Sequence, residues 1–305
     1  MKNDLISIRD LTLDQINSIF KLSTLLKKNK NKFSKALFGK TIVLIFQKPS
    51  NRTRVSFEVG MYQLGGNSLY LSPAEINIGV RESIKDVAKT ISRYVDGIVL
   101  RTFEHKNCLD MAQAAAVPVI NGLSDFSHPC QALADIFTIK EKLKNLKNVT
   151  LAYIGDGNNV CNSLLFAATK IGMNITVGTP KGYSPEDQVV KYAQEIAQLT
   201  GSKIKITEDP LEAVKGAQVV YTDVWASMGQ EEEISKRKII FKDFQINAKL
   251  LANAASGALV MHCLPAHRGE EITDEVMDSK NSIVFDQAEN RMHVQKAILI
   301  KLLKG

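Results

Sequence analysis

The chain has no hydrophobic run long enough to cross a bilayer, and it contains few cysteines. None of its apolar stretches approaches the roughly 18–20 residues that a membrane-spanning helix requires. The four cysteines include no C-x-x-C pair, which argues against a zinc site and against a disulfide framework. The N-terminal sequence MKNDLISIRDL resembles neither a secretory signal nor a transit peptide. We therefore expect a cytoplasmic protein with reduced thiols, no bound metal and no membrane partner.

Acidic residues are missing from residues 21–40, which carry seven lysines. This one segment accounts for the whole net charge of +7, because the rest of the chain has 32 basic and 32 acidic residues. A basic nucleic-acid-binding protein is the alternative that such a charge suggests. However, no aromatic pattern typical of RNA-binding proteins accompanies these lysines, and a solvated helix face explains them better. We expect no nucleic-acid partner.

Short apolar runs alternate with helical patterns along nearly the whole chain, which predicts an α/β fold with parallel strands buried on both faces. Nine strands are many for one sheet, so we expect two doubly wound parallel-sheet domains. The break is predicted at the polar stretch 144–148. Residues 1–144 then form one domain and 145–287 the other, with a C-terminal helix at 288–305 packing back on the first. The predicted strands are 41–46, 97–101, 117–120, 149–154, 174–178, 203–207, 219–224, 258–263 and 282–286.

Ligands of open α/β sheets bind beyond the carboxyl ends of the strands, and polar groups follow several strands here. Ser50, Asn51, Arg52 and Thr53 come after strand 41–46 and open a helix. Free backbone N–H groups at a helix N-terminus, together with hydroxyls and a guanidinium, are suited to binding phosphate. Surface arginines on a capped helix are the plainer alternative, but they do not explain this grouping in the first turn.

Two further groups in the first half of the chain suit a carbonyl compound. Strand 97–101 ends in Arg101, which alone is a weak signal. Strand 117–120 is followed by His128, Pro129 and Gln131, with Pro129 suited to the first helical position. An imidazole and an amide on one face can hold a carbonyl oxygen and an NH2 group, although a lone histidine would more often be structural.

The second half of the chain offers groups suited to an amino acid. Strand 149–154 leads into GDGNNV, which resembles the start of a dinucleotide fingerprint but has Val160 where a third glycine is required. Asparagine amides here could hold a polar ligand instead. Asp223 ends strand 219–224 and could bind an ammonium group, and Cys263 ends strand 258–263. We therefore predict one active site, in a cleft between the two domains.

Four ordered motifs carry a family resemblance: S-x-R-T-R at 50–54, H-P-x-Q at 128–131, D-x-x-x-S-M-G at 223–229 and H-C-L-P at 262–265. Together they resemble the aspartate/ornithine carbamoyltransferases, and the last two are typical of the ornithine branch. The resemblance covers the whole chain. It implies transfer of the carbamoyl group of carbamoyl phosphate to the δ-amine of L-ornithine, giving L-citrulline and phosphate, without a cofactor or metal. It also implies a homotrimer with sites at the subunit interfaces.

The resemblance assigns site residues one by one. Catalytic roles fall on Arg101, His128, Asp223 and Cys263. Ornithine contacts fall on Asn159, Asp223, Ser227 and Met228. Carbamoyl phosphate contacts fall on Ser50, Asn51, Arg52, Thr53, Asn77, Arg101, His128, Gln131, Cys263, Leu264 and Arg291. Arg54 is expected to pair within the first domain instead.

Two positions depart from the family pattern. Asn51 stands where the family usually has threonine, so the backbone N–H is kept and the hydroxyl is lost. Asn77 aligns with a glutamine that the family donates to the site of a neighbouring subunit, and its amide is one methylene shorter.

Two enzyme alternatives remain. A carbamoyltransferase for another amine such as putrescine would not need S-M-G, and an NAD-dependent oxidoreductase would need the glycine that GDGNNV lacks. The sequence favours direct transfer over a covalent intermediate on Cys263, because the amine substrate is already a nucleophile. His262 is expected to point to the opposite face of its strand from Cys263.

Overall fold

The computed structural model describes residues 4–76, 78, 82–226 and 231–304. In this part of the chain no helix is both long and apolar enough to span a membrane. The chain divides into two compact units, unit 1 (Met1–Ala134 with Glu289–Gly305) and unit 2 (Asp135–Ala288). The division falls inside two helices, α6 (Pro129–Leu143) and α13 (Val284–Leu303).

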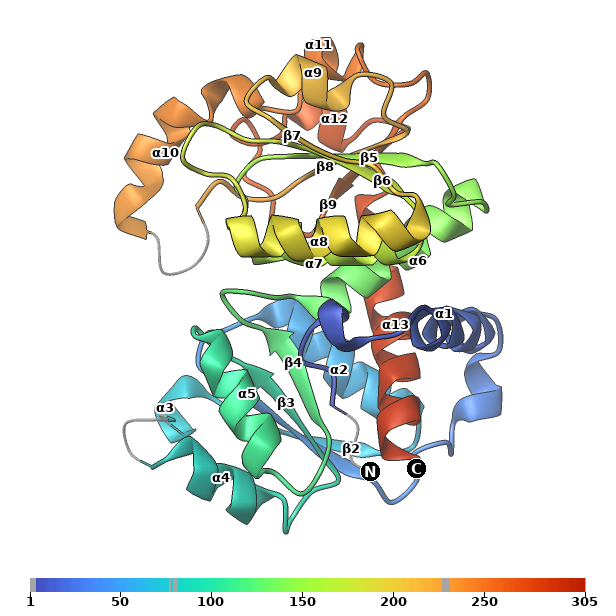
Figure 1. Cartoon of the computed structure of the whole chain (residues 1–305). Coiled ribbons are helices and arrows are strands. Elements are labelled where there is room, and N and C mark those ends of the chain that lie inside the picture. The colour runs from blue at the N-terminus through green and yellow to red at the C-terminus, as the bar shows by residue number, and fades with distance from the viewer. Residues whose placement is uncertain (1–3, 77, 79–81, 227–230, 305) are drawn as a thin grey trace. The chain divides into compact units, whose positions relative to one another are not determined.

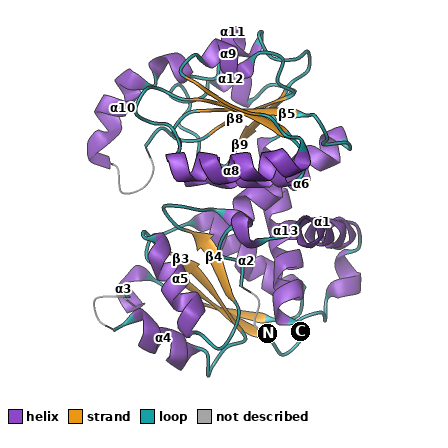
Figure 2. Ribbon diagram, in the orientation of Figure 1, coloured by secondary structure: helices purple, strands orange, loops and turns teal. Residues whose placement is uncertain are grey.

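Unit 1 contains a four-stranded sheet of order β2-β1-β3-β4 in which every neighbouring pair is parallel. Figure 2 draws its strands in orange. Its strands are β1 (Thr41–Phe46), β2 (Asn67–Leu71), β3 (Gly97–Arg101) and β4 (Val119–Leu123). Its other helices are α1 (Leu13–Lys28), α2 (Asn51–Gln63), α3 (Pro73–Ile76), α4 (Ile84–Ile91) and α5 (His105–Ala114) with the 3-10 turns Ile8–Asp10 and Lys30–Phe33.

Unit 2 contains a five-stranded parallel sheet of order β7-β6-β5-β8-β9. Its strands are β5 (Thr150–Ile154), β6 (Asn174–Gly178), β7 (Ile204–Thr207), β8 (Val219–Thr222) and β9 (Leu259–His262). Its other helices are α7 (Asn159–Lys170), α8 (Asp187–Thr200), α9 (Pro210–Val214), α10 (Ile234–Ile240), α11 (Ala248–Leu251) and α12 (Asp274–Met277) with 3-10 turns Glu231–Glu233 and Lys242–Phe244.

The central strands are buried because helices cover both faces of each sheet. Figure 1 shows α7 and α8 on one face of the unit 2 sheet, with α9, α11 and α12 on the other. On the second of these faces Val214, Leu250 and Val276 pack with Val220 and Val260 of the sheet in one buried apolar cluster. The predicted α/β class with two parallel-sheet domains is confirmed.

One strand was not predicted and one predicted strand was wrong, and each has a physical reason. β2 was missed because it is an edge strand whose side chains are only partly buried, so the sequence shows no continuous apolar run. The predicted strand 282–286 makes one parallel bridge, between Ser282 and Val260, and then enters α13 at Val284. A short apolar run alone does not distinguish a buried strand from the start of a buried helix.

The open edge of β4 carries the N-terminal segment. Leu5 forms a parallel bridge with Ile120, donating its N–H to Val119 O and accepting from Asn121 N. Asp4 accepts a hydrogen bond from Val119 N at 2.7 Å. These bonds satisfy backbone groups that an uncovered edge strand would leave open.

Candidate active site

The N-terminus of α2 carries the predicted phosphate-binding turn. Ser50 is the N-cap, and its side chain accepts a hydrogen bond from Thr53 N at 3.3 Å. The Ser50 hydroxyl also donates to Thr53 Oγ1 at 3.0 Å. Thr53 is fully buried, Arg52 is half-buried, and Asn51 is exposed as the first helical residue. The turn therefore combines ordered hydroxyls, an arginine and a helix N-terminus, which favours an anion.

Arg101 ends β3 as a buried cation, with 5% of its surface exposed. Burial, together with the nearby charges of Arg291 and Arg52, lowers the pKa of Arg101 to about 9. Its Nε atom is buried and has no hydrogen-bond partner among the described residues. A bound anion would supply the missing acceptor and offset the crowded positive charge.

Arg291 of α13 joins the turn to the His-Pro-x-Gln motif. Its Nη2 donates to Thr53 Oγ1 and lies 3.3 Å from His128 Nε2. Because a guanidinium only donates, His128 Nε2 accepts and the ring proton is on Nδ1. Burial lowers the pKa of His128 well below its ordinary value, and Arg291, Arg101 and Lys48 lower it further. The imidazole is therefore neutral, so it can donate a hydrogen bond without adding charge.

The motif residues follow from local structure. Pro129 begins α6, as predicted, which places His128 directly before the helix. Gln131 lies in the first turn of α6 and is 2% exposed. Arg54 pairs within unit 1 as expected, since its Nε donates to Glu58 Oε1 at 3.0 Å and its guanidinium lies 3.9 Å from the centroid of the Tyr70 ring.

The sequence prediction missed Lys48, which is 7% exposed and lies over the Phe103 ring at 4.5 Å. Its charge contributes to the low pKa of His128, so it belongs to the same cationic cluster. Lys48 stands two residues before Ser50, and this closeness to the predicted phosphate-binding turn could have identified it from the sequence.

In unit 2, Asp223 follows β8 as the centre of a hydrogen-bonded group. Asn158 Nδ2 donates to Asp223 Oδ2 at 2.9 Å, and Val224 N donates to Asp223 Oδ1 at 2.8 Å. Asn158 is also the N-cap of α7, where it accepts from Val160 N and Cys161 N. The resemblance assigns the ornithine contact to the neighbouring Asn159, which is buried in the first turn of α7, and that assignment stays a prediction.

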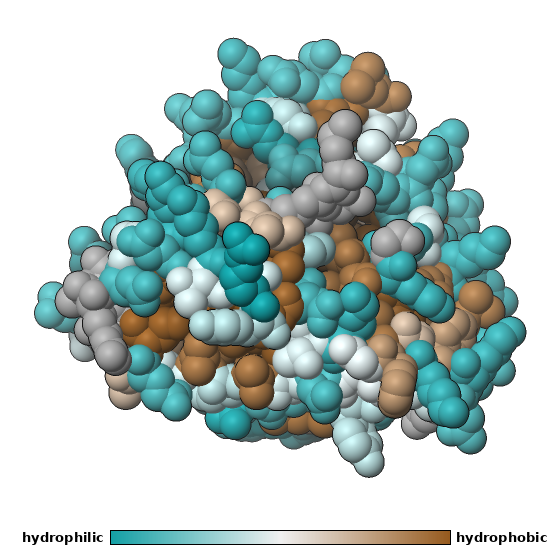
Figure 3. Space-filling view, turned by 90° about the horizontal axis from the view of Figure 1, so that it is seen from below, coloured by the Kyte–Doolittle hydropathy of each residue, from teal (hydrophilic) through white to brown (hydrophobic). Residues whose placement is uncertain are grey.

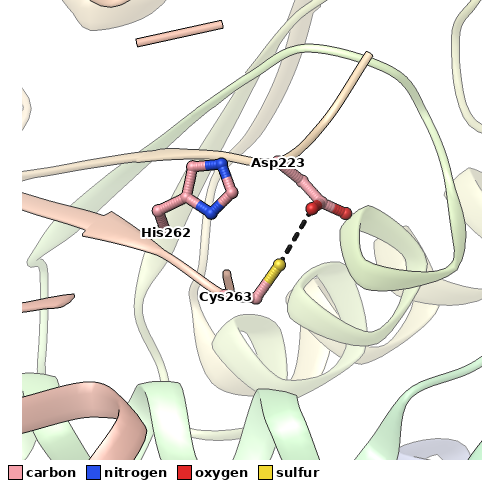
Figure 4. A group of neighbouring side chains, drawn as sticks. All are labelled: Asp223, His262 and Cys263. Carbon is pink, nitrogen blue, oxygen red and sulfur yellow. Dashed lines mark hydrogen bonds between the residues drawn. The ribbon is translucent and has the colours of Figure 1, made fainter. Parts of the chain in front are cut away.

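Cys263 lies at the tip of β9, and its thiol donates to Asp223 Oδ1 at 2.9 Å (Figure 4). Burial raises the pKa of the Cys263 thiol well above its ordinary value, and the charge of Asp223 raises it further. The sulfur is thus a protonated hydrogen-bond donor, whereas a nucleophilic cysteine requires a lowered pKa.

The orientation predicted for His262 was wrong. A ring nitrogen of His262 lies within 4.8 Å of both the Asp223 carboxylate and the Cys263 sulfur (Figure 4). Strand alternation ends at Leu264, where φ is 59°, so the chain turns back and Leu264 N donates to His262 Nδ1 at 2.8 Å. His262 Nε2 then carries the proton and faces Glu271 Oε1 at 3.1 Å. Both ring nitrogens are engaged, so this ring is not available as a base for Cys263.

Three predicted contacts, Asn77, Ser227 and Met228, lie outside the described residues. The others fall into two groups. Unit 1 holds Ser50, Asn51, Arg52, Thr53, Arg101, His128, Gln131 and Arg291, and unit 2 holds Asn159, Asp223, Cys263 and Leu264.

Comparison with known families gives a match over almost the entire chain. Residues 3–141 match the carbamoyl-P binding domain of aspartate/ornithine carbamoyltransferase, and residues 147–302 match its Asp/Orn binding domain. The chain belongs to the aspartate/ornithine carbamoyltransferase family.

Relatives and solved structures agree with this family. The chain is 52% identical over 304 residues to ornithine carbamoyltransferase of Thermococcus kodakarensis, covering 99% of this chain and 96% of the relative. The solved ornithine carbamoyltransferase from Pyrococcus furiosus superposes with a TM-score of 0.97 at 51% identity, covering 100% of this chain and 98% of the other. The solved anabolic ornithine carbamoyltransferase from Campylobacter jejuni subsp. jejuni gives a TM-score of 0.94 at 38% identity, covering 99% of each chain.

The GDGNNV turn has a packing role that differs from that of a dinucleotide-binding loop. A Cβ at Gly157 would lie 2.2 Å from Pro185 N. The glycine is therefore needed for the close approach of the Ser184–Pro185 segment of the same chain, and not for the approach of a pyrophosphate. Asn158 already occupies N–H groups at the start of α7. Both observations disfavour the NAD-dependent alternative and agree with membership of the carbamoyltransferase family.

Two groups of side chains in the described part of the chain have metal-ligand chemistry. They are Asp223 with His262 and Cys263, and His267 with Glu270 and Glu271. In the first group the donors and acceptors are engaged with one another and with Leu264 N. In the second, Glu271 Oε1 accepts from His267 N at 2.5 Å and faces His262. The absence of a resident metal stays a prediction.

Proposed function

We propose that the protein transfers the carbamoyl group of carbamoyl phosphate to the δ-amine of L-ornithine, releasing L-citrulline and phosphate. Full-length relatives at about half identity are named ornithine carbamoyltransferase. The observation in the structure that supports the proposal most directly is Arg101. It is a buried cation close to Arg52 and Arg291, and its Nε has no hydrogen-bond partner within the described ranges of the chain. A phosphate ester fits this cluster because it supplies both charge and acceptor oxygens.

The chemistry divides between the two units. In the proposal, Ser50, Asn51, Arg52 and Thr53 hold the phosphate, while His128, Gln131 and Arg291 hold the carbamoyl group. The neutral amine of ornithine attacks the carbonyl carbon, so a C–N bond forms and a tetrahedral oxyanion develops. Arg101, His128 and Thr53 stabilise that oxyanion, an effect that is usually the largest catalytic contribution. The C–O bond to phosphate then breaks, phosphate leaves with the electron pair, and the departing phosphate accepts the proton that the attacking nitrogen gives up.

Unit 2 groups suit the amino-acid substrate. Asp223 offers a carboxylate to the α-ammonium group, and Cys263 and Asn159 complete the polar surroundings. Free alkyl ammonium groups have a pKa of about 10.4, so the site must favour the neutral δ-amine. In the proposal the cationic cluster of Arg52, Arg101 and Arg291 favours the neutral δ-amine, because nearby positive charges disfavour an ammonium ion. The proposal includes no metal or organic cofactor.

A citrulline assay with ornithine, putrescine and aspartate offered in parallel tests the proposal. We expect turnover with ornithine only. Putrescine also carries an ammonium group that Asp223 could bind, but it lacks the α-carboxylate of an amino acid. Faster turnover with putrescine would reject ornithine as the substrate.

Arg52→Ala tests the phosphate turn. The change removes charged hydrogen bonds worth about 1.5–3 kcal/mol, so carbamoyl phosphate affinity should fall roughly 10- to 150-fold while the fold persists. Titration calorimetry with carbamoyl phosphate measures the affinity, and thermal unfolding checks the fold. Unchanged affinity would exclude Arg52 from the site.

Cys263→Ser tests the role of the thiol. A protonated thiol that donates to Asp223 is not a nucleophile, so the serine hydroxyl should retain measurable turnover with a raised Michaelis constant for ornithine. Initial-rate plots should intersect, as direct transfer in a ternary complex requires. Parallel plots, or a carbamoylated Cys263 found by mass spectrometry, would establish a covalent intermediate instead.

We further propose a homotrimer in which a neighbouring subunit contributes Asn77. Supporting this, α2 presents Val55, Val59 and Tyr62 to solvent on one face, and Leu69 of the edge strand β2 is also exposed. Figure 3 views the face of the molecule seen from below Figure 1 and shows hydrophobic patches among hydrophilic side chains. Such patches often mark subunit contacts.

Val59→Glu tests the homotrimer, because it places a charge on the exposed apolar face of α2. It should yield a smaller species in light scattering, whereas Leu199→Glu on α8 should not.

The remaining parts of the proposal concern context. We propose a cytoplasmic location, supported by four free thiols, three of them buried. We propose the biosynthetic direction, supported by the anabolic relative named above. We also propose that functional domains comprise residues 1–144 with 288–305, and 145–287.

A further inference from the structure

Arg237 of α10 is a buried cation that contacts several loops of unit 2. It is 6% exposed, and its Nη1 donates to Asp156 Oδ2 at 2.9 Å and to Trp225 O at 2.8 Å. Its Nε donates to Glu233 Oε2 at 2.7 Å. The guanidinium lies 4.8 Å from the centroid of the Tyr183 ring. Every one of these contacts is directional, so together they fix the position of the side chain.

The partners of Arg237 lie beyond the carboxyl ends of three strands. Asp156 follows β5, Tyr183 follows β6 and Trp225 follows β8. The loops are also tied to one another, since Gly157 N donates to Tyr183 O at 2.8 Å. Trp225 and Glu233 stand on either side of residues 227–230 in the sequence. Arg237 therefore links Trp225 and Glu233 to Asp156, which follows the end of β5.

The same contacts bear on Asp223, the proposed ammonium-binding residue. Asp223 is two residues before Trp225, and Asn158, two residues after Asp156, donates to its carboxylate. The negative charge of Asp223 is close enough to raise the pKa of Asp156. Two buried carboxylates in proximity repel each other, and the positive charge of Arg237 offsets that repulsion.

The charge state of the pair agrees with this arrangement. Burial is the main cause that raises the pKa of Asp156, and the charges of Asp223 and Glu233 add to it. The charge and hydrogen bond of Arg237 act in the opposite direction, and the net pKa is about 6. At neutral pH Asp156 is thus mostly ionised and paired with Arg237. The positive charge that offsets the repulsion between Asp156 and Asp223 therefore comes from Arg237, which lies on α10.

We infer that Asp156 and Arg237 are positioning residues for the amino-acid substrate, because their ion pair holds Asp223 and the Trp225 flank at the tip of β5. This inference rests on the proposed function. It assigns the pair a task in recognising ornithine, whereas the proposed contacts of carbamoyl phosphate lie mainly in unit 1.

The test uses four variants of the full chain: Asp156→Asn, Arg237→Gln, the double variant and Arg237→Lys. Each single removal should raise the Michaelis constant for ornithine about tenfold or more and leave that for carbamoyl phosphate within about twofold. The double variant should raise the Michaelis constant for ornithine by less than the product of the two single increases, because each single change already breaks the same Asp156–Arg237 ion pair. Arg237→Lys keeps the charge and should recover part of the loss.

Lys205→Gln is the matched control, because it removes a cation from the exposed pair that Lys205 forms with Glu212 in the same unit. It should change neither Michaelis constant. Should Arg237→Gln fail to fold, Asp156→Asn and Arg237→Lys carry the comparison, with thermal unfolding measured for each.

The outcomes separate the inference from the proposed function. An active wild type with equal losses for both substrates would show a general structural role and overturn the inference, and so would unchanged ornithine constants. A wild type that makes no citrulline from ornithine would reject the proposed function and the inference together.

Discussion

Replacing Arg101 by methionine should lower kcat about 10²- to 10³-fold, the usual cost of losing one donor to a developing oxyanion. Methionine has a similar length but no charge and no donor, so neither phosphate nor the carbonyl oxygen would be stabilised. The folded state should not suffer, because burial disfavours the Arg101 cation and its Nε lacks a partner among the described residues. Steady-state kinetics should therefore show a large loss of kcat, while thermal unfolding should show an unchanged or higher melting temperature.

Arg54→Met is the control for this experiment. Arg54 also belongs to the S-x-R-T-R motif, but it pairs with Glu58 and lies over Tyr70. Its loss should leave carbamoyl phosphate kinetics within about twofold, as expected when only a surface ion pair worth 0–1 kcal/mol is removed. An Arg101→Met enzyme that kept wild-type kcat would rule out Arg101 as the group that stabilises the oxyanion.

Asp223→Asn should produce the second large effect, this time on ornithine. Removing the charge that faces the α-ammonium group should cost about 2–5 kcal/mol in kcat/KM for ornithine, the range for a broken buried charge pair. Calorimetric binding of carbamoyl phosphate alone should be unchanged, because its proposed contacts lie mainly in unit 1.

The thiol of Cys263 provides an independent measurement on the same variant. The Asp223 charge raises the pKa of Cys263, so Asp223→Asn should lower that pKa and increase the rate of alkylation at a given pH. An equal loss of carbamoyl phosphate binding and ornithine turnover, with an unchanged thiol pKa, would mean that Asp223 acts only through the fold.

The sequence predicted most of the sheet framework because central parallel strands are apolar on both faces. β1 (TIVLIF) and β3 (GIVLR) were predicted at their observed bounds, and both are buried almost throughout. β2 has exposed and half-buried side chains in alternation, so its sequence gave no such signal. The segment 282–286 showed the opposite problem, since burial made the start of α13 as apolar as a strand.

The candidate site could be predicted where residue chemistry coincided with a strand end. Arg101 ends a strand, and Ser50, His128 and Asp223 follow strands. Topology alone therefore predicted them at the carboxyl edges of their sheets. Partners in long-range contacts could not be found this way. Arg237 is 81 residues from Asp156, and only the folded chain brings the two together.

Local geometry set a second limit on prediction. The choice between Asn158 and Asn159 depends on which one is the N-cap of α7, which is decided within a single turn. The orientation of His262 depends on the left-handed conformation of Leu264, a residue type that rarely adopts it. Neither is encoded in a spacing pattern that can be recognised without the backbone.

The bridge between Leu5 and Ile120 has a practical consequence for handling the protein. Deleting residues 4–6 would uncover β4, and Asn121 would lose backbone and side-chain partners at Leu5 and Ile6. An uncovered strand is a template for edge-to-edge aggregation. Proteolytic trimming or an affinity tag placed tightly against this segment should therefore reduce solubility before it affects catalysis, and purification is better served by a tag separated from residue 4 by a flexible linker.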